Sequence, residues 1–427
     1  MALNRRHFIG GVVGVGALLV GVGALLRPGD RGAAYSDYFR TLNQELKNHG
    51  PMRPVLLIDL DRLDHNIDVV MQSVQRGGKH LRLVEKSLPA PGLLDYICKR
   101  ACTQRLMSFH QPFLNHDALT FPQSDILLGK PLPVRSAELF YQTHKGPFDP
   151  ARQLQWLLDT PAHLQQYLAL AQGLGTRLRI NIELDVGLHR GGVADMATLG
   201  QMLGLIRANP QHLEFAGFMG YDPFVGMGVP GILGSADELF AKVMQQYNNA
   251  VDFTRQQFAD LWHADLTLNT AGSPSYRMHE RESLSSEVSV GTAMLKPTHY
   301  DLPSLTDHVP ATWIATPVLK RTGAVRIPAL DGKSKLFSWW DTNQRETYFI
   351  YGGNWMAEYE SPAGLQSNGL YGRSSNQEMV NGSTAVGLEV DDQVFLRPTQ
   401  TESVLLQFGD LLGVRGGKIV ESWPVYS

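Results

Sequence analysis

Eight short apolar runs, separated by polar or helix-compatible stretches, constrain the fold of this chain more than any other feature. Each run has the length of a strand, and several intervening segments have the length and composition of helices. Strands that alternate with helices form a parallel sheet whose faces are covered. The runs span residues 81–87, 105–110, 125–130, 155–159, 178–186, 213–221, 266–273 and 287–295.

The number of these units predicts how the sheet closes. Eight strand–helix units within roughly the length usual for the architecture indicate a closed (β/α)₈ TIM barrel. A doubly wound open sheet is the alternative. It is less favoured because no glycine-rich dinucleotide fingerprint follows any of the runs.

Polar side chains follow the apolar runs with unusual regularity. The carboxyl ends of TIM-barrel strands meet at one face, so these side chains are expected to converge there. The amine of Lys86, at the end of the first run, is the group around which the others would gather. The set is Lys86, His110, Lys130, Asp159, Asp185, Arg190, Tyr221, Asp222, Asn269, Ser273, Gly291 and Thr292.

The first 34 residues predict an export signal that is separate from the fold. Arg5 and Arg6 precede an apolar, glycine-rich run from Phe8 to Leu26, and the pattern resembles the twin-arginine class. Small residues suit cleavage after Ala34, which would release the protein into the periplasm. An uncleaved membrane anchor is the alternative, because the run is nearly long enough to span a bilayer.

The remaining chain divides into two predicted domains. Residues 35–303 form the barrel, preceded by a lead-in strand over 54–60 whose pairing partner stays open. Residues 304–427 lose helical periodicity and contain short β-like runs, which predicts a C-terminal β-domain. Within it, residues 354–383 are rich in Gly, Ser and Asn and predict a long loop.

Composition excludes some functions. Lys and Arg number 38 against 41 Asp and Glu, and no long basic run occurs, which argues against a nucleic-acid partner. The only cysteines, Cys98 and Cys102, lie four residues apart in a predicted helix without nearby histidine. They predict two thiols and neither a metal site nor a disulfide.

Three segments point to a phosphate-bearing cofactor. Arg190 lies in a glycine-rich turn after a strand, where backbone can approach a ligand closely. Small hydroxyl and glycine residues at 272–273 and 291–292 predict a phosphate cradle, which TIM barrels commonly form after strands seven and eight. Opposite the amine of Lys86, these elements suit pyridoxal phosphate, an aldehyde with an anionic tail.

With these residues in place, the chain resembles the fold-type III pyridoxal-phosphate enzymes, the alanine-racemase-like family, and within it the branch of D-threonine aldolase and D-serine dehydratase. The resemblance rests on residues 55–60, Lys86, 183–187 with Arg190, 220–221, 269–273, 291–292 and 394–398. It implies that Lys86 holds the cofactor as an aldimine and that Arg190 lies beside the ring. Tyr221 and Asn269 would help to hold the cofactor, and Gly272, Ser273, Gly291 and Thr292 its phosphate.

One departure from that branch concerns its divalent metal. Its members bind the metal through a histidine and a cysteine or aspartate after a C-terminal strand. The matching positions here are Gln400 and Glu402. A neutral amide is a poor replacement for imidazole, so no metal is expected, and Glu402 is the weak candidate for a hard cation.

The resemblance implies a lyase that acts on a D-3-hydroxy amino acid, as a homodimer and without a nucleic-acid partner. An amino-acid racemase is the first alternative; it would need a second acid–base group, for which His110, Tyr351 and Tyr371 are candidates. A non-catalytic pyridoxal-phosphate-binding protein is the second alternative. A carbohydrate-active barrel, using pairs among Asp159, Asp185 and Asp222, is the third.

Overall fold

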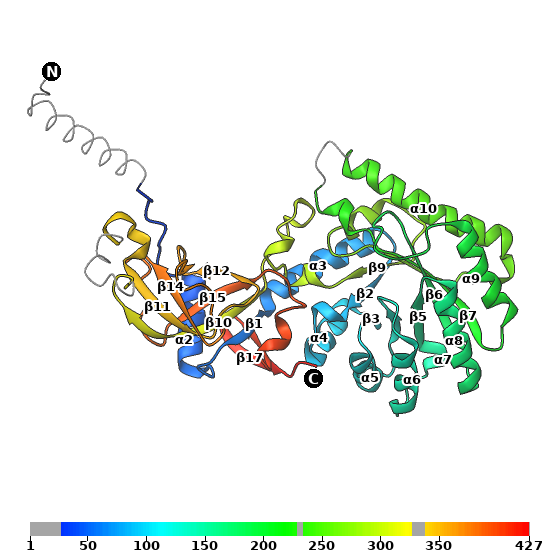
Figure 1. Cartoon of the computed structure of the whole chain (residues 1–427), viewed down its shortest axis with the longest axis horizontal. Helices are drawn as coiled ribbons and strands as arrows, with labels where there is room; N and C mark the ends of the chain where they lie inside the picture. The colour runs from blue at the N-terminus through cyan, green and yellow to red at the C-terminus, as the bar shows by residue number, and fades with distance from the viewer. Residues whose placement is uncertain (1–26, 229–233, 327–337, 427) are drawn as a thin grey trace, which may run out of the picture. The chain divides into compact units, whose positions relative to one another are not determined.

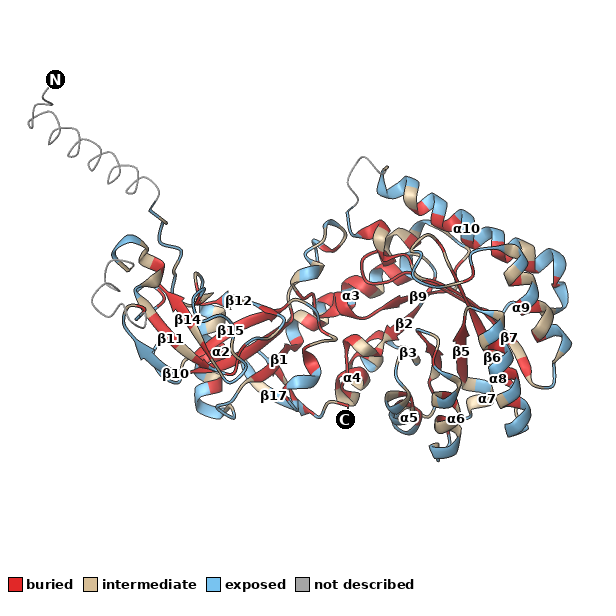
Figure 2. Ribbon diagram, in the orientation of Figure 1, coloured by how far each residue is buried: buried red, intermediate tan, exposed pale blue. Residues whose placement is uncertain are grey.

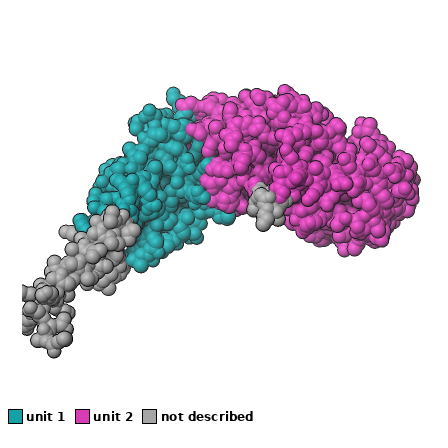
Figure 3. All heavy atoms as spheres, turned by 90° about the horizontal axis from the view of Figure 1, so that it is seen from above, with its two compact units in different colours: residues 1–55, 313–397, 417–419 teal, residues 56–312, 398–416, 420–427 magenta. Residues whose placement is uncertain are grey.

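The structure is a computed structural model that describes residues 27–228, 234–326 and 338–426. It contains two compact units, coloured separately in Figure 3 and described separately below. Most of the predicted export signal, residues 1–26, lies outside the described residues, and residues 27–34 have no helix or strand. None of the helices within the described ranges has the length and apolar character needed to cross a membrane.

Eight parallel strands close into a barrel in the larger unit, in the order in which they occur along the chain (Figure 1). Strand β9 pairs with β2 and closes the ring, with His80 opposite Glu287 and Leu83 opposite Val290. The predicted TIM barrel is therefore confirmed. The strands are β2 (His80–Val84), β3 (Arg105–Ser108), β4 (Asp125–Leu128), β5 (Leu154–Leu158), β6 (Leu178–Leu184), β7 (Leu213–Gly220), β8 (Thr267–Thr270) and β9 (Glu287–Val290).

Helices cover the outside of the barrel, and all of them except the four-residue α7 bury part of their surface (Figure 2). Helix α8 shows how the sequence sets their limits: Thr160 caps its first turn and Gly175 ends it in the left-handed region, at φ 62°. Its buried face consists of Leu164, Tyr167 and neighbours at helical spacing. The covering helices are α4 (Pro91–Ala101), α5 (Gln111–Thr120), α6 (Val134–Thr143), α7 (Pro150–Gln153), α8 (Pro161–Leu174), α9 (Met196–Ala208) and α10 (Ala236–Gln257).

A buried arginine occupies the barrel interior near the amino ends of the strands. The Arg82 guanidinium is completely buried and contacts the carboxylates of Glu287 and Asp125, each at 2.5 Å. It also donates to the carbonyl oxygens of Leu106 and Asp125, both at 2.9 Å. Because every charge in this cluster has a partner, the arginine can remain inside the barrel at tolerable cost. The cluster closes the end of the barrel opposite the predicted site.

Most of the lead-in strand, residues 56–59, groups with the barrel unit. Strand β1 (Val55–Asp59) continues into helix α3 (Leu60–Arg76) and pairs in parallel with β16 (Leu411–Arg415). By its contacts, the barrel unit contains residues 56–312, 398–416 and 420–426. This grouping differs from the predicted boundary at residue 303, because strand pairing returns the last part of the chain to β1.

The smaller unit is a mostly antiparallel sheet, as the C-terminal runs predicted. Helix α2 (Asp37–His49) belongs to the same unit, and Phe39 packs on Trp313 and Phe395 at ring distances of 5.8 and 4.9 Å. The prediction of one long loop over residues 354–383 is wrong, because residues 357–361, 366–367 and 377–382 within it form short strands. The strands of this unit are β10 (Thr312–Thr322), β11 (Glu346–Tyr351), β12 (Ala357–Ser361), β13 (Gln366–Ser367), β14 (Gln377–Gly382) and β15 (Gln393–Pro398).

Candidate active site

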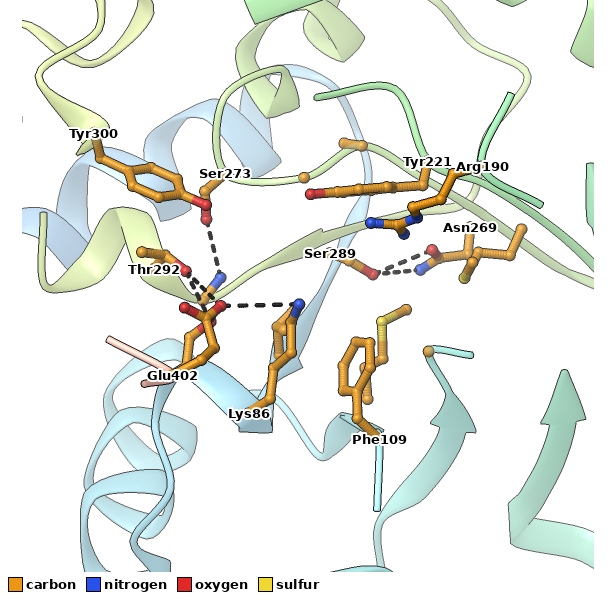
Figure 4. Close-up of a pocket in the computed structure, with 18 residues that line it drawn as sticks. Lys86, Phe109, Arg190, Tyr221, Asn269, Ser273, Ser289, Thr292, Tyr300 and Glu402 are labelled. Atoms are coloured by element: carbon orange, nitrogen blue, oxygen red, sulfur yellow. Dashed lines mark hydrogen bonds and ion pairs between the residues drawn. The ribbon is translucent and has the colours of Figure 1, made fainter. Parts of the chain in front are cut away.

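A pocket lies at the carboxyl ends of the barrel strands. All eight side chains and glycines that the sequence assigned to the cofactor site line it: Lys86, Arg190, Tyr221, Asn269, Gly272, Ser273, Gly291 and Thr292. Figure 4 shows the Lys86 amine between the Phe109 ring and the Glu402 carboxylate, with Arg190 and Tyr221 across the pocket. The strand ends have therefore brought together residues as far apart in sequence as Lys86 and Thr292.

Lys86 does not lie on the strand itself, contrary to the sequence expectation. Strand β2 ends at Val84, and Glu85–Ser87 form a single 3₁₀ turn. Within this turn the Glu85 side chain is completely buried, whereas that of Lys86 lines the pocket. The turn therefore separates an acid and an amine that are adjacent in sequence into two different environments.

The Lys86 amine is surrounded by mixed charges and an aromatic face. Its Nζ lies 3.8 Å from Oε1 of Glu402 and 4.8 Å from the centre of the Phe109 ring. Burial lowers the pKa of Lys86; the Glu402 carboxylate raises it, and the cations Arg190 and Lys130 lower it further. A larger neutral fraction of the amine favours attack on a carbonyl carbon.

Arg190 is presented by a rigid glycine-rich turn after β6. Asp185 accepts hydrogen bonds from the amides of Gly187 and His189, both at 3.0 Å, and anchors the turn. Gly192 has φ 94°, and a Cβ there would lie 2.4 Å from the Asp185 nitrogen, so no side chain fits. The guanidinium consequently lies over the Tyr221 ring, 4.9 Å from its centre.

Glycines and hydroxyls form the opposite wall. A Cβ at Gly272 would lie 2.5 Å from the Tyr221 ring, and one at Gly291 would lie 2.7 Å from the carbonyl oxygen of Val84. Ser273 Oγ accepts the amide hydrogens of Gly291 at 3.3 Å and Ala293 at 3.0 Å. The hydroxyl hydrogen of Ser273 can therefore be donated to another acceptor. Tyr300 also lines this wall of the pocket.

Asn269 contributes to the floor of the pocket. Its amide nitrogen donates to Glu287 and to Ser289, both at 2.8 Å, and the side chain is almost completely buried. Both of its amide hydrogens are thus used within the barrel. Asn269 links the pocket to the charged cluster around Arg82, which shares Glu287.

A second, more open cavity adjoins the pocket; we call it the vestibule. The two share Lys86, Phe109, Tyr300 and Glu402. His110 and Lys130, which the sequence placed at strand ends, lie in the vestibule and not in the pocket. The full vestibule lining is Lys86, Phe109, His110, Phe113, Lys130, Tyr300, Gln400, Glu402 and Leu406.

Behind Lys86 lies a buried acidic cluster that the sequence did not reveal. Burial raises the pKa of Glu85 well above its usual value, and the Asp117 carboxylate raises it further. Neither oxygen of the Glu85 carboxylate has a donor within the described residues. The Tyr426 hydroxyl donates to Asp117, and the Tyr426 ring stacks on Phe113 at 4.5 Å.

The other strand-end acids have structural partners. Asp222 accepts from Ser275 at 2.7 Å and from His279 at 2.9 Å, and Asp159 accepts from the Gly192 amide at 3.2 Å. Tyr351 and Tyr371, the candidate acid–base tyrosines, belong to the other compact unit. In the part of the chain that the structure describes, no group of three or more His, Cys, Asp or Glu could hold a metal ion.

Sequence reasoning missed several lining residues. Phe109 and Ser87 are the sequence neighbours of the predicted residues His110 and Lys86. Their positions at the ends of apolar runs could therefore have indicated that they line the pocket. Tyr300 lies in a 3₁₀ turn without periodicity and gave no signal. The sequence predicts for Glu402 only a weak candidacy as a metal ligand, whereas in the structure its carboxylate lies 3.8 Å from the Lys86 amine.

Comparisons with known proteins extend these observations. The family model described as alanine racemase, N-terminal domain, matches residues 58–298. No curated protein sequence matches the chain. The solved structures described next are only 15% or 16% identical to this chain, so the similarity to them establishes the fold alone.

Three solved structures illustrate that similarity. D-threonine aldolase from Filomicrobium marinum has a TM-score of 0.64 and 16% identity, over 88% of this chain and 97% of that one. D-threo-3-hydroxyaspartate dehydratase from Delftia sp. HT23 has a TM-score of 0.64 and 15% identity, over 87% and 97%. Alanine racemase from Bacillus anthracis has a TM-score of 0.61 and 15% identity, over 87% and 97%.

Proposed function

Because the chain belongs to the family of the alanine racemase N-terminal domain, which is pyridoxal-phosphate-dependent, we propose that it is a pyridoxal-phosphate lyase acting on a D-3-hydroxy amino acid. The observation that carries the proposal is the meeting of all eight expected cofactor residues around the Lys86 amine in one pocket. The racemase and the non-catalytic binder remain the alternatives to be tested.

The residues present fit the cofactor. An amine with a lowered pKa suits bonding to an aldehyde, and the Ser273, Thr292 and Tyr300 hydroxyls suit an anionic tail. The two glycines of the wall leave the space that a Cβ would fill. Arg190, held over Tyr221, offers donors to polar atoms of a flat ring.

When bound, pyridoxal phosphate supplies an electron sink that lets a bond to the substrate Cα break heterolytically. Lys86 then holds or moves a proton at Cα. The substrate amine takes the place of the Lys86 amine on the cofactor, so the released Lys86 amine is the basic group nearest to Cα. The Phe109 ring beside it excludes water from one side of the amine. The vestibule next to Lys86 leaves room for a substrate side chain that carries a hydroxyl, which supports a lyase.

Two further properties belong to the proposal. The enzyme is expected to act as a homodimer, as members of this family typically do. The export signal over residues 1–34 would place it in the periplasm. Light scattering of the purified protein tests the first, and cell fractionation tests the second.

The visible spectrum tests the central proposal. The purified protein should absorb near the wavelengths of lysine-bound pyridoxal phosphate, and borohydride reduction should attach the label to Lys86. D-Threonine should then yield glycine or a 2-oxo acid, detected by chromatography. Interconversion of amino-acid enantiomers without such products would establish the racemase, and a spectrum that no amino acid perturbs would establish the binder.

A further inference from the structure

The Glu402 carboxylate has a defined place between the pocket and the vestibule. Its Oε1 accepts from the Ser87 hydroxyl at 2.8 Å and from the Thr292 hydroxyl at 3.4 Å, and lies 3.8 Å from the Lys86 amine. Its Oε2 accepts from Thr401 at 3.3 Å. Figure 4 shows this carboxylate pointing at the amine. The Ser87 and Thr401 hydroxyls and the Lys86 amine therefore orient the carboxylate. The longer Thr292 contact adds less, because the Ser87 and Thr292 hydroxyls also bond to each other at 2.7 Å.

Glu402 also lies where a substrate side chain must pass. It lines both the pocket and the vestibule, together with Lys86. A substrate whose amine takes the place of the Lys86 amine has its Cα one bond away and its Cβ two bonds away. With Oε1 at 3.8 Å from the amine, an oxygen on Cβ can reach hydrogen-bond distance of Glu402.

Glu402 is the only carboxylate among the described residues that line either cavity. The immediate neighbours of its carboxylate are hydrogen-bond donors and the Lys86 ammonium group. They leave a lone pair of the carboxylate able to accept a proton and return it. The side chain is 30% exposed and lines the more open vestibule, so a proton can exchange with solvent. These are the requirements of a general acid–base group.

We propose that Glu402 is a catalytic residue that exchanges a proton with the 3-oxygen of the substrate. This inference rests on the proposed lyase function and adds the group that acts at Cβ. In this inference Glu402 transfers the proton itself. It does not act as the ligand of a metal cation that would polarise the substrate 3-oxygen. Lys86 and Glu402 then divide the chemistry between Cα and the oxygen on Cβ.

The proton balance can be written for both lyase reactions. In cleavage, the 3-hydroxyl O–H bond breaks and its proton bonds to Glu402, while Cβ–O becomes a carbonyl. The Cα–Cβ bond breaks, its electron pair stays on the Cα fragment, and that fragment takes a proton from Lys86. In dehydration, Lys86 removes the Cα proton, the Cβ–O bond breaks with its pair on oxygen, and protonated Glu402 supplies the proton that makes water.

The test compares two substrates in Glu402→Gln, a change that preserves the acceptor oxygen for Ser87. D-Threonine turnover should fall by about 10²- to 10⁴-fold, the usual contribution of a general acid–base group. Exchange of the Cα hydrogen of D-2-aminobutyrate with D₂O should stay within about threefold, because that substrate has the same carbon chain without the hydroxyl and needs only Lys86. Glu138→Gln, which removes a carboxylate on helix α6, is the control and should change neither rate.

A second readout does not depend on activity. The Glu402 charge raises the pKa of Lys86, so the amine should titrate at lower pH in Glu402→Gln. Reductive ¹³C-methylation of the cofactor-free protein, followed by NMR across pH, measures this shift, and Glu138→Gln should show none. An unchanged titration would overturn the contact on which the inference rests.

Several results would overturn the inference. Equal losses in cleavage and in Cα exchange would make Glu402 a residue that positions Lys86 or the cofactor. A turnover that requires Mn²⁺, with weaker Mn²⁺ affinity in Glu402→Gln, would make it a metal ligand. Wild-type protein that binds the cofactor but neither exchanges nor cleaves any amino acid would instead overturn the lyase function itself.

Discussion

The buried acid next to Lys86 gives the sharpest prediction about stability. Burial and the neighbouring Asp117 raise the pKa of Glu85, and burial raises the pKa of Asp117 to about 6. The folded protein therefore keeps protons that the unfolded chain loses above about pH 4 to 4.5. A raised carboxyl pKa means that the free energy of unfolding decreases as pH rises through this window.

The size of the effect follows from proton linkage. Each pH unit over which the fold retains one extra proton costs about 1.4 kcal/mol of stability. Burial raises the pKa of Asp117 as well, so this carboxyl contributes to the stability change in the same direction. The pKa of Glu85 is raised well above its ordinary value, so its contribution continues toward neutral pH.

The perturbation is Glu85→Gln, which has the same shape and no titrating proton. Its amide can donate to the Asp117 oxygen that has no donor among the described residues. Between pH 5 and pH 8, the variant should lose less stability than the wild type, by up to about 4 kcal/mol if Glu85 keeps its proton throughout.

Urea unfolding of the cofactor-free protein, followed by tryptophan fluorescence at pH 5, 6, 7 and 8, measures the difference. Asp95→Asn removes a partly exposed carboxylate that pairs with Lys99, and it should leave the pH dependence unchanged. Parallel pH profiles for the wild type and Glu85→Gln would refute the reasoning. They would mean that Glu85 is ionised in the folded protein.

Three further predictions follow from geometry and sequence. Gly272→Ala should weaken pyridoxal-phosphate binding at least tenfold in a spectroscopic titration, because the new Cβ would lie 2.5 Å from the Tyr221 ring. The control Gly173→Ala, whose Cβ would have no atom within 4 Å, should leave the affinity unchanged. Equal affinities for the two variants would show that the Tyr221 ring can move. Arg82→Met should reduce the free energy of unfolding by about 3–5 kcal/mol, because it leaves the buried carboxylates of Glu287 and Asp125 without their shared cation. The surface control Arg135→Met should reduce it by less than about 1 kcal/mol. A similarly small loss for Arg82→Met would contradict the inferred role of Arg82 in the buried charge cluster. N-terminal sequencing of protein isolated from the periplasm should begin at Tyr35, and an unprocessed chain in the membrane fraction would favour an anchor.

The barrel could be predicted because its strands are buried on both faces. A strand of this kind is a continuous apolar run, and parallel strands place their last residues at one end whatever separates them in sequence. Lys86, Arg190 and Ser273 could therefore be assigned to one site from their positions after strands. That reasoning needed no knowledge of packing.

Contacts between distant segments could not be predicted in this way. Ser87 and Glu402 are 315 positions apart, and their hydrogen bond depends on how the segment after residue 398 folds back onto the barrel unit. The 3₁₀ turn that buries Glu85 and exposes Lys86 to the pocket has no periodicity to detect. Tyr300 likewise lies in a short turn whose sequence resembles any loop.

The last residues of the chain support one wall of the vestibule. Tyr426 stacks on Phe113, and the Phe113 ring lies 5.0 Å from that of His110, both of which line the vestibule. The Tyr426 ring is only 4% exposed, so a substitution at this residue would reach the vestibule lining through Phe113. Replacing Tyr426 would therefore change how a substrate is admitted, through the vestibule side chains Phe113 and His110.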